Sequence, residues 1–370
     1  MTKSNKIIVT VSNDLNQDQR MFKICTSLTK LGYDVVLIGR TKKDSLPLRN
    51  QTYQQKRLFC FFEKGFLFYA EFNFRLLLFL FRHSFQYVYS VDLDTLLPGF
   101  ISAKIFRKKN IFDAHEYFTE TPEIENRWFV KAFWNMIANI CIPKSSATIT
   151  VNESLATLFS GMYGKQFHYL YNTSKLKNEN QIILKNPSQK IVLYQGVLNQ
   201  GRGLELLIDV MPLLPEITLH LVGEGDLSKA LRNQASHSTA SDRIVFKGWL
   251  FGEDLTQSTR EAWVGINILD ASSKNYYYSL ANKFFDYLHA ELPSINMAFP
   301  EYNKILGQFP VGITISLLEE KQLVQAINLL IQNKNFYNQM QSACKVAKQY
   351  FQWSNEEAKL ENIMNKLEHS

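Results

Sequence analysis

Short runs of β-branched and aliphatic residues alternate with amphipathic helical windows, and this alternation constrains the fold of the chain more than any other feature. In the first half such runs occupy residues 6–11, 34–39, 87–91, 111–114 and 147–151. In the second half they occupy residues 190–195, 217–222, 244–247, 264–268 and 293–296. Strands that alternate with helices predict parallel sheets covered by helices. We therefore expect an α/β fold with two Rossmann-like, doubly wound parallel-sheet domains.

A polar stretch without periodicity, residues 172–180, separates the two series of strands. It predicts an N-terminal domain at 1–172, a linker at 173–189 and a C-terminal domain at 190–353. A chain of 370 residues is long enough for two such domains. Apolar residues at helical spacing in 335–350 and 355–367, with no strand between them, predict two terminal helices.

Charge and cysteine usage exclude several classes of function. The formal net charge is +7, and Lys and Arg are spread among many acids, so nucleic acid is not an expected partner. The same surplus suits an anionic substrate or an anionic membrane face, and the charge does not choose between them. The four cysteines lie far apart without a C-x-x-C pair, which predicts reduced thiols and no zinc site. No secretory signal opens the chain, so we expect cytoplasmic residence.

Residues 59–85 are crowded with Phe, Leu and Tyr and depart from the average composition. Charged and polar residues interrupt the segment, so it is too short to span a bilayer, which takes about 20 apolar residues. It is either a core helix packed on the sheet or a face that rests on a membrane, with Arg75 and Arg82 meeting lipid phosphates. Both interpretations stay open at this stage.

Polar residues follow three strands of the first half, where doubly wound sheets bind their ligands. A titratable His beside a carboxylate at the end of the fourth run is typical of a catalytic position. The polar residues after the first run, 12–14, and after the third run, 92–94, are explained equally well as helix N-caps. We take His115 and Glu116 as catalytic candidates, and the acceptor-side candidates are Asn13, Asp14, Asp92 and Asp94.

Two segments of the second half are candidates for binding a diphosphate. A glycine-rich turn at 196–203 lies between a strand and a helix, where backbone amides and Arg202 can contact phosphate oxygens. The second segment, residues 279–286, opens the predicted helix that runs to residue 290. Asp286 lies one turn into that helix, where a carboxylate can bind ribose hydroxyls. The alternative interpretation is that Lys283 is a solvated charge on the helix surface and that Asp286 is an ordinary surface residue. The candidate diphosphate ligands are Gly196, Arg202, Leu280, Ala281, Asn282 and Lys283.

Taken together, these segments resemble the GT-B glycosyltransferases, and within them the large retaining family 4. Residues 222–226, V-G-E-G-D, resemble a V-G-x-G-x turn of that family, and 245–249, V-F-K-G-W, resemble its V-x-F-x-G strand. The resemblance implies two domains facing across a cleft, with the C-terminal helices crossing back to the first domain near 351–354; the crossover helix is expected at 354–370. It adds Gly223, Lys247, Gly248 and Trp249 to the residues expected around the donor nucleotide, beside Asp286.

Two positions, Tyr278 and Val197, lack the charged residue of the family pattern. The first acid of the family's glutamate pair falls on Tyr278, whereas the second falls on Asp286. The Arg and Lys of the family's G-R-L-x-x-x-K-G segment fall on Val197 and Arg202, and we expect Lys283 to supply the missing charge.

The resemblance implies a retaining transferase that moves a sugar from a nucleotide diphosphate sugar to an acceptor. The apolar segment 59–85 and the basic balance favour a glycan, lipid-linked or surface-polysaccharide acceptor, with peripheral contact to the cytoplasmic membrane face. We expect no metal and no cofactor, and we expect His115 to face the donor sugar. The alternatives are a nucleotide-sugar epimerase of the same fold, or a catalytically impaired nucleotide-sugar-binding protein, which Tyr278 and Val197 would explain. A nicotinamide enzyme is disfavoured because G-x-G-x-x-G is missing.

Overall fold

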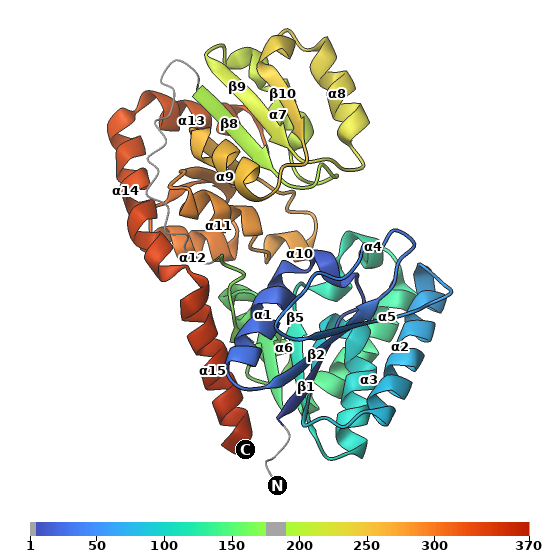
Figure 1. Ribbon diagram of the computed structural model, residues 1–370. Helices are drawn as coiled ribbons and strands as arrows, with labels where there is room; N and C mark the ends of the chain where they lie inside the picture. The colour runs from blue at the N-terminus through green and yellow to red at the C-terminus, as the bar shows by residue number, and fades with distance from the viewer. Residues whose placement is uncertain (1–4, 175–189, 370) are drawn as a thin grey trace. The chain divides into compact units, whose positions relative to one another are not determined.

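The computed structural model describes residues 5–174 and 190–369, and it confirms an α/β fold with two parallel sheets (Figure 1). The chain divides into a first unit, Met1–Asn172 with Ser354–Ser370, and a second unit, Thr173–Trp353. Residues 175–189 of the expected linker lie outside the described residues. Cys25, Cys60, Cys141 and Cys344 are buried free thiols.

In the first unit the described strands form a sheet in the order β3-β2-β1-β4-β5-β6-β7, with all neighbours parallel. The strands are β1 (Lys6–Thr10), β2 (Asp34–Arg40), β3 (Gln54–Leu58), β4 (Tyr87–Val91), β5 (Lys109–Ala114), β6 (Ala147–Thr150) and β7 (His168–Tyr169). The sequence predicts five of them within two residues at each end; it misses the edge strands β3 and β7.

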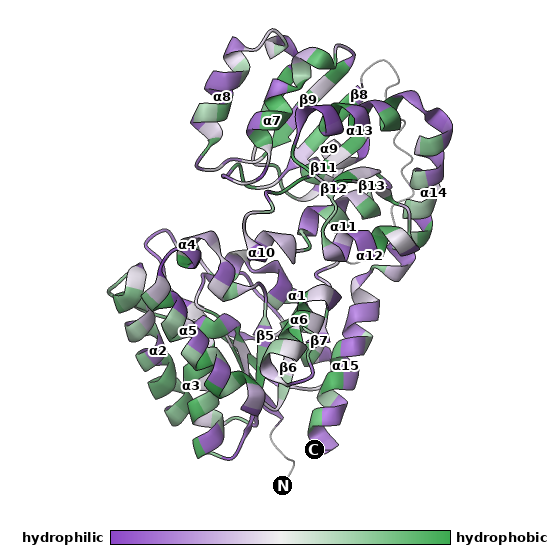
Figure 2. Ribbon diagram, turned by 180° about the vertical axis from the view of Figure 1, so that it is seen from behind, coloured by the Kyte–Doolittle hydropathy of each residue, from purple (hydrophilic) through white to green (hydrophobic). Residues whose placement is uncertain are grey.

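The helices of this unit are α1 (Gln19–Lys30), α2 (Gly65–Arg82), α3 (Asp92–Ile105), α4 (Pro122–Glu125), α5 (Trp128–Cys141), α6 (Glu153–Tyr163) and, from Ser354 on, α15 (Trp353–His369). One side of α2, including Phe72 and Leu76, is buried against Ile8, Val36 and Val88 of the sheet. The core-helix interpretation of residues 59–85 therefore holds for this side, although hydrophobic residues extend over the rest of α2 as well (Figure 2).

In the second unit the described strands form a parallel sheet in the order β10-β9-β8-β11-β12-β13. The strands are β8 (Lys190–Gln195), β9 (Ile217–Val222), β10 (Ile244–Gly248), β11 (Val264–Asn267), β12 (Ser294–Met297) and β13 (Gly312–Ile315). The helices are α7 (Leu204–Asp209), α8 (Ser228–His237), α9 (Gly252–Glu261), α10 (Lys274–Tyr277), α11 (Asn282–His289), α12 (Pro300–Gln308), α13 (Glu320–Gln332) and α14 (Lys334–Tyr350). The sequence misses only β13 among these strands.

Of the two terminal helices, only α15 returns to the first unit, which corrects the expectation that both cross back. α14 stays in the second unit because it buries an apolar stripe there and contacts α11. In the first unit α15 is held by Glu357, which accepts hydrogen bonds from Ser27 Oγ of α1 at 2.7 Å and Lys30 Nζ at 3.0 Å. Its Glu356 accepts a hydrogen bond from the backbone N–H of Tyr171 at 3.0 Å.

Each sheet contains a topological switch point, where neighbouring strands lead to connections in opposite directions. It lies between β1 and β4 in the first unit and between β8 and β11 in the second. Doubly wound sheets bind ligands outside the carboxyl ends of such strands. Residues that follow β1, β4, β8 and β11 are therefore the ones to inspect.

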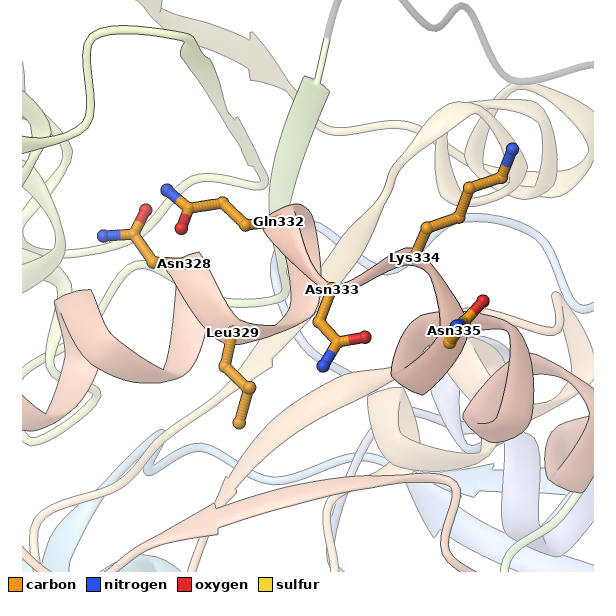
Figure 3. Close-up of a pocket in the computed structure, with 6 residues that line it drawn as sticks. All are labelled: Asn328, Leu329, Gln332, Asn333, Lys334 and Asn335. Carbon is orange, nitrogen blue, oxygen red and sulfur yellow. The ribbon is translucent and has the colours of Figure 1, made fainter.

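A depression of 440 Å³ lies at the turn between α13 and α14 of the second unit (Figure 3). Its lining is Asn328, Leu329, Gln332, Asn333, Lys334 and Asn335. The side chain of Lys334 points away from those of Asn328 and Gln332, so these groups do not converge on one point.

Within residues 5–174 and 190–369, no helix is both long enough and apolar enough to cross a bilayer.

Candidate functional site

A buried ion pair underlies the polar residues at the switch point of the first unit. Arg20 of α1 reaches Asp113 of β5 through Nη2 at 3.0 Å and Nε at 3.2 Å, and both side chains are buried. Tyr89 Oη donates to the same carboxylate at 2.8 Å. Burial opposes ionisation of Asp113, but the Arg20 guanidinium outweighs it and holds the pKa of Asp113 well below its usual range. Asp113 is therefore a fixed negative charge.

His115 follows β5, and two carboxylates hold it. Its Nε2 lies 3.2 Å from Asp113 Oδ2, and its backbone N–H donates to Asp92 Oδ1 at 2.8 Å. Burial disfavours the imidazolium, but the charge of Asp113 and the hydrogen bond to it outweigh burial and raise the pKa of His115 to about 9. The ring is thus cationic at neutral pH and turned toward Asp113.

The carboxylates at the start of α3 complete this cluster. Asp92 has a left-handed backbone, with φ of 54°, a conformation that costs energy outside glycine and that collects at functional sites. Burial raises the pKa of Asp92 to about 8 and that of Asp94 to about 6. Ser12 Oγ after β1 donates to Asp94, so the cluster spans the switch point between β1 and β4. Asp92 and Glu116 line a small pocket together with Tyr117 and other side chains.

Asn13 and Asp14 are arranged differently from the other acceptor-side candidates. Asp14 caps a short 3-10 helix by accepting from the backbone N–H of Asn16 at 3.0 Å, and it pairs with Arg57 Nη2 at 2.7 Å. Asn13 donates to Asp18, which caps α1. The helix-cap interpretation therefore describes what Asp14 does in this unit.

Three glycines form the carboxyl edge of the second sheet beside its switch point. Gly196, Gly223 and Gly248 follow or end β8, β9 and β10 with φ of 132°, 131° and 65°. Their backbones are tied together, since Gly196 N–H donates to Val222 at 2.9 Å and Gly223 N–H to Gly248 at 2.7 Å. A Cβ on Gly223 would lie 2.0 Å from the carbonyl oxygen of Gly196, so this close approach needs glycine.

Two cationic side chains meet beside Gly196. Lys283 of α11 is 9% exposed, and its Nζ lies 3.5 Å from the ring centroid of Tyr194. Burial lowers the pKa of Lys283, and the charge of Arg202 lowers it further. Arg202 Nε is buried without a hydrogen-bond partner among the described residues. The nearby carboxylate of Asp286 favours the charged form of Lys283, so one acid lies near these two basic side chains.

The backbone at the start of α11 is partly engaged. The N–H of Ala281, an expected phosphate ligand, donates to Tyr302 Oη at 2.9 Å. Leu280 and Asn282 flank Ala281, and Asn282 begins the helix.

Within residues 5–174 and 190–369 no group of three or more His, Cys, Asp or Glu side chains could hold a metal ion.

The residues expected around the nucleotide lie along the same edge. Asp286 Oδ2 accepts from Gln195 Nε2 at 2.9 Å, which places this carboxylate at the end of β8. Trp249 follows Lys247 and Gly248 of β10, is half exposed, and stacks on Phe251. About half of the Trp249 side chain is therefore open to solvent.

The two departures from the family pattern are also placed. Tyr278 ends α10 with its ring against Tyr277, at 5.1 Å between centroids. Val197 is partly exposed, and its carbonyl accepts from Tyr194 Oη at 2.9 Å. This bond fixes the Tyr194 ring under Lys283.

Sequence reasoning missed Arg20 and Tyr194. Arg20 falls on the stripe of α1 that carries Ile24 and Leu28, and a charge on an apolar stripe is a signal of a buried partner. Tyr194 lies in a buried strand, where its ring looks like ordinary core.

We predict that Arg20→Met lowers the free energy of unfolding by about 3–5 kcal/mol, because it leaves Asp113 buried and unpaired. Urea unfolding measures the change. Lys43→Met, which removes the exposed pair with Glu63, is the control and costs about 1 kcal/mol or less. A loss as small as that of the control would contradict the role of the buried pair.

The raised pKa of His115 predicts a pH-dependent contribution to stability. A group whose pKa rises on folding stabilises the protein fully below its unfolded pKa, and the contribution is lost as pH rises through the folded value. His115→Asn should therefore cost up to about 3 kcal/mol near pH 6, and the difference should fade through about pH 9. Thermal unfolding of both proteins tests this, with surface His237→Asn as the control. A difference that grows with pH would refute the assignment.

Comparison with known proteins supports the resemblance seen in the motifs. The model described as Glycosyltransferase Family 4 matches residues 18–173, and the model described as Glycosyl transferases group 1 matches residues 189–333. No curated protein sequence matches the chain significantly.

Several solved structures share the fold. Sucrose-phosphate synthase from Thermosynechococcus elongatus has a TM-score of 0.82 at 14% identity, covering 98% of both chains. Anabaena HepE in complex with UDP-glucose has a TM-score of 0.74 at 14% identity, covering 98% of this chain and 99% of that one. WaaG, a glycosyltransferase of lipopolysaccharide biosynthesis, has a TM-score of 0.70 at 11% identity, covering 96% and 99%. Since glycosyltransferase models match both units of the fold, the chain belongs to the GT-B glycosyltransferases as a family 4-like member.

Proposed function

We propose that the chain is a retaining glycosyltransferase that uses a nucleoside diphosphate sugar as donor and glycosylates a glycan, lipid-linked or surface-polysaccharide acceptor. The observation that carries this proposal is the pair of cations at the glycine edge of the second sheet. Lys283 is buried beside Gly196 with a lowered pKa, and Arg202 adds a second positive charge. A bound pyrophosphate would add negative charge beside both groups.

The donor would lie along the carboxyl edge of the second sheet. Its pyrophosphate would contact Lys283, Arg202 and the amides near Gly196 and Leu280, and its ribose would be bound by Asp286. A flexible turn of glycines lets phosphate oxygens approach the backbone closely. Support comes from HepE, which has been solved with UDP and with UDP-glucose, so a uridine nucleotide is the first donor to examine.

In the proposed reaction the bond from the anomeric carbon to the donor phosphate oxygen breaks, and a bond to an acceptor hydroxyl oxygen forms. The hydroxyl proton passes to the departing phosphate, which leaves as a nucleoside diphosphate. Negative charge grows on that leaving group, and fixed cations stabilise it more in the transition state than in the ground state. Retention of configuration, by attack on the face from which the phosphate departs, is what the family resemblance implies.

The first unit would supply the acceptor side. Asp92 and Asp94 have raised pKa values of about 8 and about 6, so they can accept or donate hydrogen bonds to hydroxyl groups near neutral pH. His115 would contribute positive charge and a fixed backbone carbonyl. Relatives such as WaaG act in lipopolysaccharide biosynthesis, which supports a glycan or lipid-linked acceptor.

We predict that Lys283→Met weakens UDP binding by about 10- to 100-fold, because a charge-assisted contact is worth about 1.5–3 kcal/mol. Thermal shift over a UDP titration measures this, since a ligand of the folded state at about 100 times its Kd adds about 2.7 kcal/mol. The control is Lys229→Met on the exposed surface of α8 in the same unit. Equal UDP affinity for Lys283→Met and wild type would contradict the diphosphate site.

A turnover assay then separates the candidate reactions. UDP-sugar and a glycan acceptor should give a glycosylated product whose anomeric configuration matches the donor. Release of an epimerised sugar without transfer would instead identify an epimerase. Binding without any turnover over a panel of sugars and acceptors would identify an impaired protein, as Tyr278 and Val197 allow.

A further inference from the structure

Two buried tyrosine hydroxyls hold helix α11, which carries both Lys283 and Asp286. One belongs to Tyr302 of α12 and contacts the backbone of Ala281, directly before the helix. The other belongs to Tyr287 of α11 itself and contacts the neighbouring strands. Both tyrosines are fully buried. In the sequence the two points of contact lie on either side of Lys283 and Asp286.

Tyr302 fixes the beginning of α11. Its Oη accepts the backbone N–H of Ala281 at 2.9 Å, so this amide is already bonded in the unliganded protein. The ring packs edge-on against Phe284 of α11, with 5.6 Å between the centroids, and the two helices lie next to each other (Figures 1 and 2). Burial raises the pKa of Tyr302 to about 12, so its hydroxyl stays protonated.

A chain of buried polar side chains continues from Tyr302 into the sheet. The Tyr302 hydroxyl is hydrogen-bonded to the side chain of Asn267, which ends β11. Asn267 Nδ2 donates to Asn296 Oδ1 of β12 at 2.9 Å, and Asn296 Nδ2 donates to Ser294 Oγ at 3.0 Å. Burying polar groups costs free energy that an apolar core would avoid. In return, a fully bonded network holds the Tyr302 hydroxyl in one place, which apolar packing does not do.

Tyr287 fixes α11 against the switch point of the second sheet. Its Oη accepts the backbone N–H of Gln195 in β8 at 3.3 Å. The same oxygen lies 3.3 Å from the carbonyl oxygen of Leu193 in β8 and 3.2 Å from that of Ile266 in β11, and these two share its one hydrogen. A Cβ on Gly265 would lie 2.5 Å from Cδ2 of the Tyr287 ring, so this glycine makes room for the ring. The hydroxyl therefore connects α11 to both strands of the switch point.

Gln195 extends this contact to Asp286. Its Nε2 donates to Asp286 Oδ2 at 2.9 Å, and its Oε1 accepts from Thr259 Oγ1 of α9 at 2.9 Å. Since Gln195 is buried and bonded on both sides, its side-chain amide has one orientation. The Asp286 carboxylate is thus oriented in the unliganded protein.

The position of α11 matters because the proposed ligand contacts are short. Charge-assisted hydrogen bonds to phosphate oxygens are about 2.7–2.9 Å long, and a binding site needs its groups held within about 0.5 Å. An exposed lysine could follow a shifted ligand by changing rotamer. Lys283 is buried instead, with its Nζ 3.5 Å from the ring centroid of Tyr194, so its ammonium moves with the helix.

We propose that Tyr287 and Tyr302 are positioning residues of the donor site, whose buried hydroxyls hold α11 so that Lys283 meets the pyrophosphate and Asp286 the ribose. This inference rests on the proposed donor site and assigns its geometry to two groups outside it. Because both tyrosines are fully buried, they act through α11 and not by touching the donor.

The test is substitution of each tyrosine by phenylalanine, which removes one hydroxyl and keeps the ring. Calorimetric titration with UDP and with GDP should show a Kd raised about two- to tenfold for Tyr302→Phe and for Tyr287→Phe, the loss expected for one hydrogen bond. The matched control is Tyr33→Phe in the first unit, where a buried tyrosine donates its hydroxyl to Glu368. This control should bind nucleotide like wild type.

Hydrogen exchange of the unliganded proteins supplies a measurement that needs no nucleotide. The amides of residues 281–287 should exchange at least about threefold faster in Tyr302→Phe and in Tyr287→Phe, because the helix opens more often when one contact is lost. In Tyr33→Phe they should keep their wild-type rates. A merely structural role would lower the melting temperature of all three variants and leave the nucleotide affinity of the folded proteins unchanged.

The outcomes separate this proposal from the donor site on which it rests. Wild-type affinity in either phenylalanine variant would overturn the role of that tyrosine, as would weaker binding with unchanged exchange. Tighter binding by Tyr302→Phe would show that the hydroxyl only competes with phosphate for the Ala281 amide, which also overturns its positioning role. If wild type bound neither UDP nor GDP, the proposed donor site would fail, and the exchange rates alone would decide whether the hydroxyls hold α11.

Discussion

The two basic side chains beside Gly196, Lys283 and Arg202, are the constraint on which the account of this enzyme depends. Lys283 sits over the Tyr194 ring in a buried place, where desolvation and the neighbouring Arg202 both disfavour its ammonium form. A protein that keeps a lysine under such conditions gives up stability that an apolar side chain would provide. A bound pyrophosphate would remove the penalty, because it would supply charge of the opposite sign at hydrogen-bonding distance. The same features thus give a cost in the unliganded protein and support the proposed affinity for a nucleotide.

The two switch points follow opposite electrostatic rules. In the second unit the charge of Arg202 lowers the pKa of Lys283, whereas in the first unit Arg20, Asp113 and His115 form a satisfied network. That network fixes the backbone after β5 and leaves Asp92 and Asp94 as buried carboxyls with raised pKa values. A charged ligand therefore suits the switch point of the second unit, and a neutral ligand with hydroxyl groups suits that of the first unit. This difference agrees with the proposed donor site on the second sheet and the proposed acceptor site on the first.

Much of the fold could be predicted from the sequence, because buried parallel strands such as β4 and β9 are continuous apolar runs. β3 could not, since Gln54–Leu58 is polar and is held at the sheet edge by backbone pairing with β2. The placement of Lys283 and Asp286 near Gly196 and Gln195 was predictable from strand-to-helix turns. The contribution of Tyr194 was not, because a ring within a strand gives no sign of what it faces. Asp14 is the opposite case: the sequence marked it as a candidate site residue, whereas in the structure it caps a 3-10 helix.

A crystal structure of the chain with a uridine diphosphate sugar tests the central claim most directly. The account predicts a β-phosphate oxygen within about 3 Å of Lys283 Nζ, with further oxygens on Arg202 and the amide of Gly196. A pyrophosphate bound elsewhere, with Lys283 still resting on Tyr194 and making no contact with it, would contradict the account.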